Sequence, residues 1–140
     1  LLGAEADVIK ADNDDKSPLY CASWKGHLEV VQALLGAEAD VNKANGDGKT
    51  PVYWASRKGH LEVVQALLGA EADVNKAEYY GRTPLYWASQ NVHLEIVKAL
   101  LGAEADANKA KNDGRTPLSI SLGHNHAEIA ALLREAGARE

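Results

Sequence analysis

The stretch Thr50-Pro51-Val52-Tyr53-Trp54-Ala55-Ser56 returns 33 residues later as Thr83-Pro84-Leu85-Tyr86-Trp87-Ala88-Ser89. A related stretch precedes it, Ser17-Pro18-Leu19-Tyr20-Cys21-Ala22-Ser23, and a degraded one follows it, Thr116-Pro117-Leu118-Ser119-Ile120-Ser121-Leu122. A fixed period of this size indicates an array of one supersecondary unit, whose copies bury their core against each other. Because such an array leaves a long side surface free, the pattern points to binding before it points to catalysis.

Each copy carries the signals of two short helices. Thr50 is a favourable N-cap, and Pro51 suits the first helical position, where no amide donor is required. Gly59 ends this helix because glycine accepts a positive φ. Leu61 and Val64 begin the apolar stripe of a second helix. Since neither helix is long enough to be stable alone, stacking must supply the core, and we expect six leucines to be deeply buried: Leu34, Leu35, Leu67, Leu68, Leu100 and Leu101.

The segment between units, Asn45-Gly46-Asp47-Gly48, has turn chemistry and predicts a hairpin-like finger. The whole unit resembles the ankyrin repeat, whose signature is T-P-L-H-x-A; Tyr20, Tyr53 and Tyr86 stand where that family has His, and Ser119 replaces it in the last copy. The resemblance covers almost the whole chain and implies an all-α solenoid of stacked helix-turn-helix units with short β-hairpin fingers. We divide this single domain, 1–140, into a partial repeat at 1–13, full repeats at 14–46, 47–79 and 80–112, and a capping repeat at 113–140.

Two departures from the family pattern concern the backbone. The family usually has Gly where this chain has Glu5, Glu38, Glu71 and Glu104, and only Gly137 keeps it. A non-glycine residue at positive φ costs about 1 kcal/mol or more, so either the loop follows another path or the cost is accepted in each copy. Val92 replaces the turn glycine of the earlier copies, and a β-branched residue there predicts a strained or remodelled turn.

Several recurring polar columns have a structural interpretation. His27, His60, His93 and His126 recur one repeat apart, about 10 Å if helices pack side by side, which is too far for two of them to share a zinc ion. Each loop carries a pair of carboxylates, such as Glu38 and Asp40, which recurs because the loop recurs. A catalytic acid–base pair needs two different environments, so we interpret these carboxylates as part of the solvated surface. The column Asn42, Asn75 and Asn108 predicts hydrogen bonds between neighbouring loops. With no nucleotide loop, nucleophile motif or metal spacing, we expect neither catalysis nor a cofactor.

Composition narrows the classes of partner. The formal charge of −5 argues against nucleic acid as the main partner, and no apolar run approaches the length of a membrane span. The single Cys21 excludes an internal disulfide. Near-identical units without Met or Phe suggest a consensus-like or engineered array, or a recent natural duplication, and the sequence leaves both open. For a natural protein we expect an intracellular, cytoplasmic location.

Residues that contact the same neighbours in every unit must stay the same, whereas positions that differ between the copies are not constrained in this way. The variable positions lie at the finger tips and at the end of each first helix. These positions could form a binding surface, or they could vary by sequence drift on a surface without function. Trp24, Tyr79 and Tyr80 weigh against drift, because Tyr, Trp and Arg are enriched in binding hot spots. The resemblance implies that these positions line a concave groove for a protein partner. The predicted surface comprises Asp14, Lys16, Trp24, Lys25, Asp47, Lys49, Arg57, Lys58, Tyr79, Tyr80, Arg82, Gln90, Asn91, Arg115 and His124. The alternative function is a structural scaffold without a natural ligand.

The two ends of the array are expected to differ. The fourth unit has a diluted apolar pattern and a polar end at Arg134, Glu135 and Arg139, as a capping repeat requires. The front end shows no comparable cap, and Leu1 and Leu2 would expose apolar surface there. We therefore expect the first unit to fray before the third in hydrogen exchange, and self-association to use this end.

Overall fold

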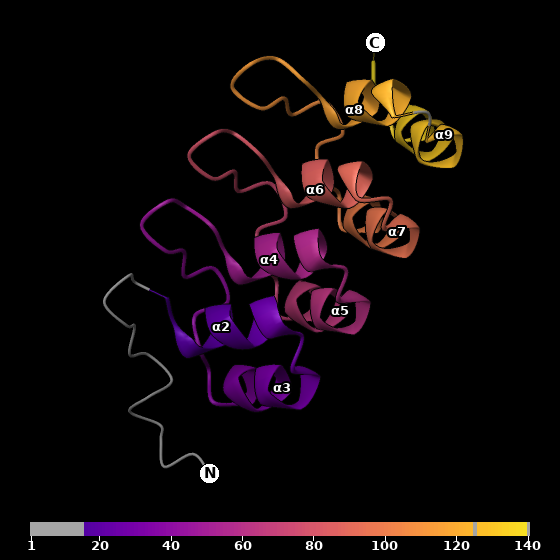
Figure 1. The fold of residues 1–140 in the computed structure, drawn as a ribbon. Helices are drawn as coiled ribbons and strands as arrows, with labels where there is room; N and C mark the ends of the chain where they lie inside the picture. The colour runs from indigo at the N-terminus through magenta and orange to yellow at the C-terminus, as the bar shows by residue number, and fades with distance from the viewer. Residues whose placement is uncertain (1–15, 125, 140) are drawn as a thin grey trace.

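The computed structural model describes residues 16–124 and 126–139, and in them it forms four stacked pairs of helices. Figure 1 shows the pairs following one another along the array, with the fingers projecting from one side and the second helices on the other. The all-α solenoid is thereby confirmed. The pairs are α2 (Pro18–Lys25) with α3 (Leu28–Gly36), α4 (Pro51–Lys58) with α5 (Leu61–Gly69), α6 (Pro84–Gln90) with α7 (Leu94–Gly102), and α8 (Pro117–Gly123) with α9 (Ala127–Glu135).

The fingers are hairpin turns rather than paired strands. The Asn45 N–H donates to the Lys49 carbonyl at 3.1 Å, and the same closure recurs between Glu78 and Arg82. Within the described residues no strand is assigned, so the fingers keep hairpin hydrogen bonds without a regular ladder. The unit boundaries fall inside these turns, and the division into repeats stays a prediction.

The first helices begin as the sequence predicts. Thr50 Oγ1 accepts a hydrogen bond from the Tyr53 N–H at 3.2 Å, and Thr83 caps α6 in the same way. Gly59 ends α4 in the left-handed region at φ 85°, a conformation that costs glycine nothing. These two signals set the first and last residues of α4.

The core runs through the stack as one continuous cluster. Leu34, Leu67 and Leu100 are buried in it, and the small residues Ala88 and Ser89 are fully covered, which lets neighbouring first helices approach closely. The prediction was wrong for Leu35, Leu68 and Leu101, which are only half-buried. Each of them lies one residue further on, about 100° around the helix, so it packs against the edge of the core rather than inside it.

The loops after the second helices keep the left-handed turn despite lacking glycine. Glu38, Glu71 and Glu104 have φ values of 66°, 67° and 69°. Helix α3 still ends at Gly36, so the turn has not moved to the preceding glycine. The cost of a non-glycine residue at positive φ is therefore accepted in these three loops, while Glu5 lies outside the described residues.

The asparagine column links neighbouring loops, as predicted. Asn42 Oδ1 accepts a hydrogen bond from the Asp73 N–H at 2.8 Å, and Asn75 Oδ1 accepts one from the Asp106 N–H at 2.7 Å. Asn108 continues the series by accepting from the Arg139 N–H at 2.9 Å. Repetition of this bond fixes the distance between consecutive loops.

The histidine column depends on the turn glycines. His60 Nε2 lies 3.1 Å from the Trp24 carbonyl oxygen, and His93 Nε2 lies 3.3 Å from that of Arg57. A Cβ at Gly26 would lie 2.7 Å from the His60 ring, and one at Gly59 would meet the His93 ring at the same distance. Each histidine thus occupies space that a glycine in the preceding unit leaves open.

Val92 interrupts this column. It occupies the turn position with φ 60°, so the strain expected from the sequence is present. Helix α6 ends at Gln90, and in the next unit His126 stacks on His124, with ring centroids 5.8 Å apart. Among the described residues, His126 makes no hydrogen bond to the Gln90 carbonyl. Among the described residues, the contact between a histidine ring and a carbonyl of the preceding unit is therefore missing between the third and fourth units.

Val92→Gly is expected to raise the free energy of unfolding by about 1 kcal/mol. The change removes backbone strain of roughly 1–3 kcal/mol and opens the space for His126, against a glycine entropy cost of roughly 0.5–1 kcal/mol. Urea denaturation measures the difference. Val92→Ala is the matched control, since it keeps a Cβ at positive φ and should gain less. A glycine variant less stable than the parent would contradict this account.

Three buried serines lack a hydrogen-bond partner. Ser23, Ser56 and Ser89 occupy one position of successive first helices, are fully buried, and their hydroxyl oxygens have no partner among the described residues. In the fourth unit, Ser121 Oγ instead donates to the Pro117 carbonyl at 2.9 Å. A buried hydroxyl without a hydrogen-bond partner lowers the free energy of unfolding, so these three serines destabilise the fold.

Ser56→Ala is therefore expected to stabilise the fold by about 0.5–1 kcal/mol, because alanine fills the position without an unpaired polar atom. Thermal unfolding of the variant checks the sign. Ser121→Ala is the paired comparison and should not stabilise, since it removes a hydrogen bond. Equal effects of the two changes would show that the Ser56 hydroxyl is satisfied in solution.

The two ends of the described array differ in exposure. Val30 in α3 is 48% exposed, whereas the equivalent Val63 and Ile96 are 2% exposed, because the preceding second helix covers them. At the other end Arg134 and Glu135 are exposed, in keeping with a polar cap. Leu1 and Leu2 lie outside the described residues. Early fraying of the first unit and self-association through this end stay predictions.

Candidate protein-binding surface

A ladder of tyrosine and tryptophan side chains runs along the first helices. Trp54 Nε1 donates to the Tyr20 hydroxyl at 2.6 Å, and Trp87 Nε1 donates to the Tyr53 hydroxyl at 2.8 Å. Burial raises the pKa of the Tyr20 and Tyr53 hydroxyls, which keeps them neutral. Each bond joins one unit to the next, so the tyrosines at the family's histidine position hold the tryptophans in fixed orientations.

Cationic side chains cover the exposed faces of this ladder. The Arg57 guanidinium lies between two indoles, with its Cζ 4.0 Å from the Trp87 ring centroid and 5.0 Å from that of Trp54. Lys49 Nζ lies 5.4 Å from the Trp54 ring, and Lys58 Nζ lies 5.4 Å from the Trp24 ring. These distances are within the range of cation–π attraction. The result is a surface in which positive charge is held against flat apolar rings.

A pocket of ≈ 400 Å³ opens between the first and second units. Its aromatic walls are Tyr20, Trp24 and Trp54, with the Trp24 and Trp54 ring centroids 6.0 Å apart. The other described lining residues are Lys16, Lys25 and Cys21, the last of which is a half-buried free thiol. A pocket of this size with mainly aromatic walls can hold an apolar group of a ligand.

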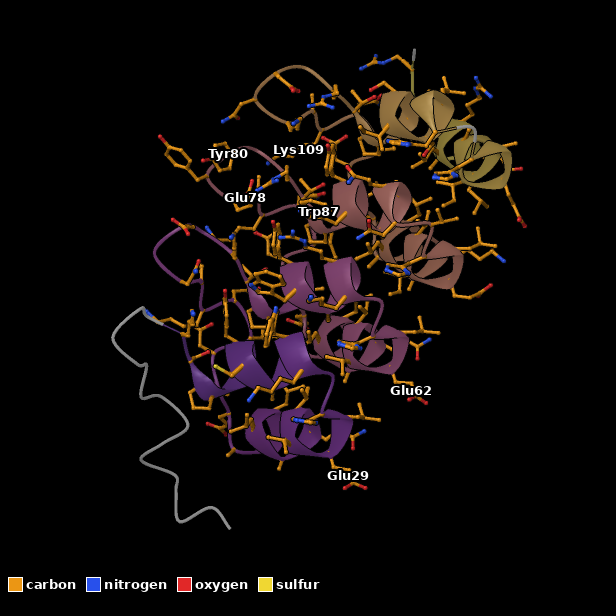
Figure 2. All side chains as sticks on the ribbon, viewed as in Figure 1. Glu29, Glu62, Glu78, Tyr80, Trp87 and Lys109 are labelled. Atoms are coloured by element: carbon orange, nitrogen blue, oxygen red, sulfur yellow. The ribbon has the colours of Figure 1, made fainter. Side chains whose placement is uncertain are left out.

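The fingers add an exposed aromatic pair. Tyr79 and Tyr80 are 73% and 57% exposed, and their ring centroids lie 5.1 Å apart. The Tyr79 N–H donates to the Asp47 carbonyl at 2.8 Å, and the Tyr80 carbonyl accepts from the Asn112 N–H at 2.9 Å. Neighbouring fingers are therefore hydrogen-bonded to each other. Figure 2 shows Tyr80 on the finger side, while Glu29 and Glu62 point outward from the second helices.

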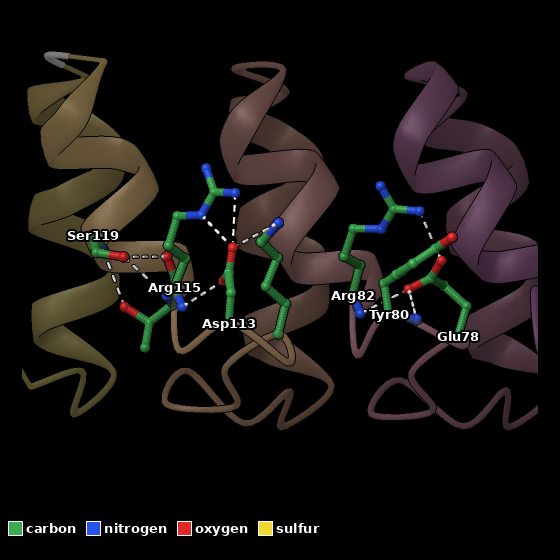
Figure 3. A network of polar contacts seen from close by, with 8 residues as sticks. Glu78, Tyr80, Arg82, Asp113, Arg115 and Ser119 are labelled. Atoms are coloured by element: carbon green, nitrogen blue, oxygen red, sulfur yellow. Dashed lines mark hydrogen bonds and ion pairs between the residues drawn. The ribbon is translucent and has the colours of Figure 1, made fainter.

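Glu78 organises the third finger from inside. Its fully buried carboxylate accepts from the Tyr80 and Arg82 N–H groups, both at 2.9 Å, and from Arg82 Nη2 at 2.8 Å (Figure 3). Burial alone would raise the pKa of Glu78, but these hydrogen bonds and the Arg82 charge together lower it. The paired Arg82 in turn lies 4.9 Å from the Trp87 ring.

The fourth finger has an exposed counterpart of this ion pair. Asp113 Oδ2 lies 2.8 Å from Arg115 Nη2 and 3.1 Å from Lys111 Nζ (Figure 3). Hydrogen bonding to Arg115 holds the pKa of Asp113 well below its usual range. Both cations of this finger thus share one carboxylate, which offsets one of their two charges.

The structure brings together only part of the surface predicted from the sequence. The aromatic and cationic contacts unite Trp24, Lys49, Arg57, Lys58 and Arg82, with Lys16 and Lys25 at the pocket. Tyr79, Tyr80 and Asp47 are exposed on the fingers as expected, but Arg82 is half-buried against Glu78 rather than exposed.

The remaining predicted positions stand apart. Arg115 is engaged by Asp113, and Asn91 donates to the Arg57 carbonyl at 3.0 Å. Among the described residues, Gln90 and His124 make no aromatic or ionic contact with the ladder. Asp14 lies outside the described residues. Membership of these positions in a binding surface stays a prediction.

Sequence reasoning missed four residues that shape the surface: Trp54, Trp87, Glu78 and Lys111. The Tyr-Trp dipeptide repeats unchanged at 53–54 and 86–87. When positions that are identical in the repeats are taken to be structural, both residues of the dipeptide are assigned to the core. Trp87 is indeed buried, but Trp54 is half-exposed and lines the pocket. The signal available in the sequence was Cys21, a small residue that stands in the first unit where the next two units have Trp54 and Trp87.

Other chemistry finds no support in the described residues. They contain no cluster of His, Cys, Asp or Glu that could hold a metal ion, and the histidine rings instead contact backbone carbonyls. In the same part of the chain, no helix is long and apolar enough to cross a membrane.

The comparison with known proteins agrees with this architecture. A family model described as ankyrin repeats (3 copies) matches residues 29–111 and 71–139. A search of curated proteins finds no match. Ankyrin repeats generally mediate protein–protein interaction and are typically non-enzymatic scaffolds. Stacked helix pairs, hydrogen-bonded fingers and a family match across most of the chain lead to one conclusion: this protein belongs to the ankyrin-repeat family.

Proposed function

We propose that the surface formed by the first helices and the fingers, called here the groove surface, binds a protein partner without catalysis. The observation that supports the proposal is the exposure of large aromatics on this side. Trp24 is 40% exposed, and Tyr79 and Tyr80 are more so. Aromatic and Arg residues are the anchors that carry most binding energy at protein interfaces.

The groove surface is also rigid enough to bind without a large ordering cost. Trp54 and Trp87 are fixed by hydrogen bonds to tyrosines of the preceding unit, and the fingers are linked through Tyr79 and Asn112. Side chains that are ordered before binding lose less conformational entropy on association. Catalysis has no comparable support, since the described residues that line the pocket include no carboxylate or histidine.

Affinity capture with a matched pair of variants tests this function. The groove variant replaces Trp24, Tyr79 and Tyr80 by alanine, and the control replaces the exposed Glu29, Glu62 and Glu95 of the second helices. Partners that are lost only from the groove variant would support the proposal. Identical profiles for both variants, or no captured partner, would favour a scaffold without a natural ligand.

For a captured partner, Tyr80→Ala is expected to weaken binding by about 2 kcal/mol if the tyrosine is a hot spot. The same change should leave the free energy of unfolding within roughly ±0.5 kcal/mol, because the side chain is exposed. Calorimetric titration and urea denaturation separate the two effects. Unchanged affinity across alanine variants of Trp24, Tyr79, Tyr80 and Arg82 would refute binding at the groove surface.

A further inference from the structure

We propose that the half of the groove surface formed by the first two units recognises an acidic peptide segment of the partner, which inserts one apolar side chain into the pocket between Trp24 and Trp54. This inference rests on the proposed function and specifies the chemistry of its ligand. It is carried by the distribution of charge, by the ordering of the cations and by the pocket.

Among the described residues, positive charge without an ion-pair partner on the groove surface gathers in this half. Lys25, Lys49, Arg57 and Lys58 form no ion pair among the described residues. In the other half, Glu78 pairs with Arg82, and Asp113 pairs with both Arg115 and Lys111. The chain as a whole carries a formal charge of −5, so a cationic zone of this kind runs against the overall balance and points to an anionic ligand.

Most carboxylates of the described residues lie away from the first helices. Glu29 and Glu62 project from the second helices, away from the fingers (Figure 2). On the finger side of the second unit, Asp47 is exposed at the finger tip, while Lys49 lies against the Trp54 ring. An acidic peptide along the first helices would therefore meet cations at close range and most carboxylates only at long range, where salt screens the repulsion.

The cations are held in place before any ligand arrives. Arg57 lies within cation–π distance of both Trp54 and Trp87, and Lys49 and Lys58 lie over indole rings. A guanidinium can keep such ring contacts while its N–H groups bind a carboxylate in bidentate fashion. Since these side chains have already lost rotamer freedom, pairing them with a ligand costs less entropy.

The pocket supplies the apolar part of the recognition. Its walls of Tyr20, Trp24 and Trp54 are aromatic, and Lys16 and Lys25 stand at its lining. A peptide that places Phe or Leu between acidic residues would bury that side chain against the rings while one of its carboxylates meets Lys25. Single-stranded nucleic acid would also offer charge and flat rings, but the negative chain opposes a polyanion, whose binding depends on many phosphate contacts.

The first experiment uses short fluorescent peptides with the full chain. One peptide places Asp and Glu around a central Phe, a second replaces the acids by Asn and Gln, and a third replaces Phe by Ala. Anisotropy is expected to show about tenfold weaker binding for each altered peptide, and binding of the acidic peptide should weaken as salt is raised. Oligothymidine is the competing ligand.

The matched protein variants are Arg57→Gln on the groove surface and Lys98→Gln on α7, each of which removes one positive charge. Arg57→Gln should weaken the acidic peptide about tenfold, and Lys98→Gln should not change its affinity. Thermal unfolding checks that both variants are folded, and Lys49→Gln replaces Arg57→Gln if the latter is not.

Cys21 gives a readout in the unaltered sequence. It is the single cysteine of the chain and lines the pocket, so its alkylation by iodoacetamide reports on the pocket alone. The acidic Phe peptide should slow alkylation, and the Ala peptide should slow it less. Equal binding of the neutral peptide, tighter binding of oligothymidine, no peptide binding, or an unprotected Cys21 would overturn the proposal. Partners that bind the groove surface independently of Arg57 would overturn it while leaving the proposed function intact.

Discussion

Replacing Leu67 by alanine is expected to lower the free energy of unfolding by about 2–5 kcal/mol. Leu67 is fully buried in α5, where it packs between the helix pairs of neighbouring units. Its truncation removes apolar contacts and leaves a cavity that the flanking helices cannot fill, because hydrogen bonds between consecutive loops fix their spacing. Urea denaturation measures the loss.

Leu68→Ala is the matched control for this change. Leu68 is the neighbouring leucine of the same helix, but it is half-buried at the edge of the core, so its truncation should cost clearly less. A loss below about 1 kcal/mol for Leu67→Ala would mean that the core is not packed as described. Equal losses for the two variants would contradict the distinction between core and edge.

Replacing Glu78 by alanine is expected to destabilise the fold by about 2–3 kcal/mol. The change leaves the half-buried Arg82 guanidinium and the Tyr80 and Arg82 N–H groups without their acceptor. Because Arg82 keeps some contact with water, we expect less than the full cost of breaking a buried ion pair. Glu78→Gln keeps one acceptor oxygen and should lose less, which chemical denaturation at neutral pH can show.

The Glu78 ion pair also predicts a pH dependence with a definite sign. The pKa of Glu78 is lowered in the folded state, so its contribution to stability is complete above the unfolded-state pKa of about 4.3 and is lost as pH falls through the lower folded-state value. The difference in unfolding free energy between the parent and Glu78→Gln should shrink on acidification from about pH 5. A difference that stays constant would show that the carboxylate is not charged in the folded protein. Asp113 titrates in both proteins, and its effect cancels.

The sequence determined the repeating unit and most of its local structure. Local signals include the cap Thr50, the turn glycine Gly59 and the loop residue Asn42. They make hydrogen bonds to residues a few positions away or one repeat away, so their spacing can be recognised in the sequence. The unusual residues Glu71 and Val92 stood out for the same reason, and Val92 does sit at positive φ. What the sequence left open was whether the Glu71 loop would keep the left-handed turn.

Only the tertiary structure decided which side chains form the groove surface. Trp54 and Trp87 repeat like framework residues, yet their environments differ because Trp54 faces the Cys21 unit and Trp87 is covered by Arg57 and Arg82. Glu78 and Asp113 offset most of the positive charge of one half of the surface through contacts that depend on the path of each finger. Charge compensation and pocket shape depend on which side chains of neighbouring units come into contact. The sequence pattern does not specify these contacts, because they form only when the units stack.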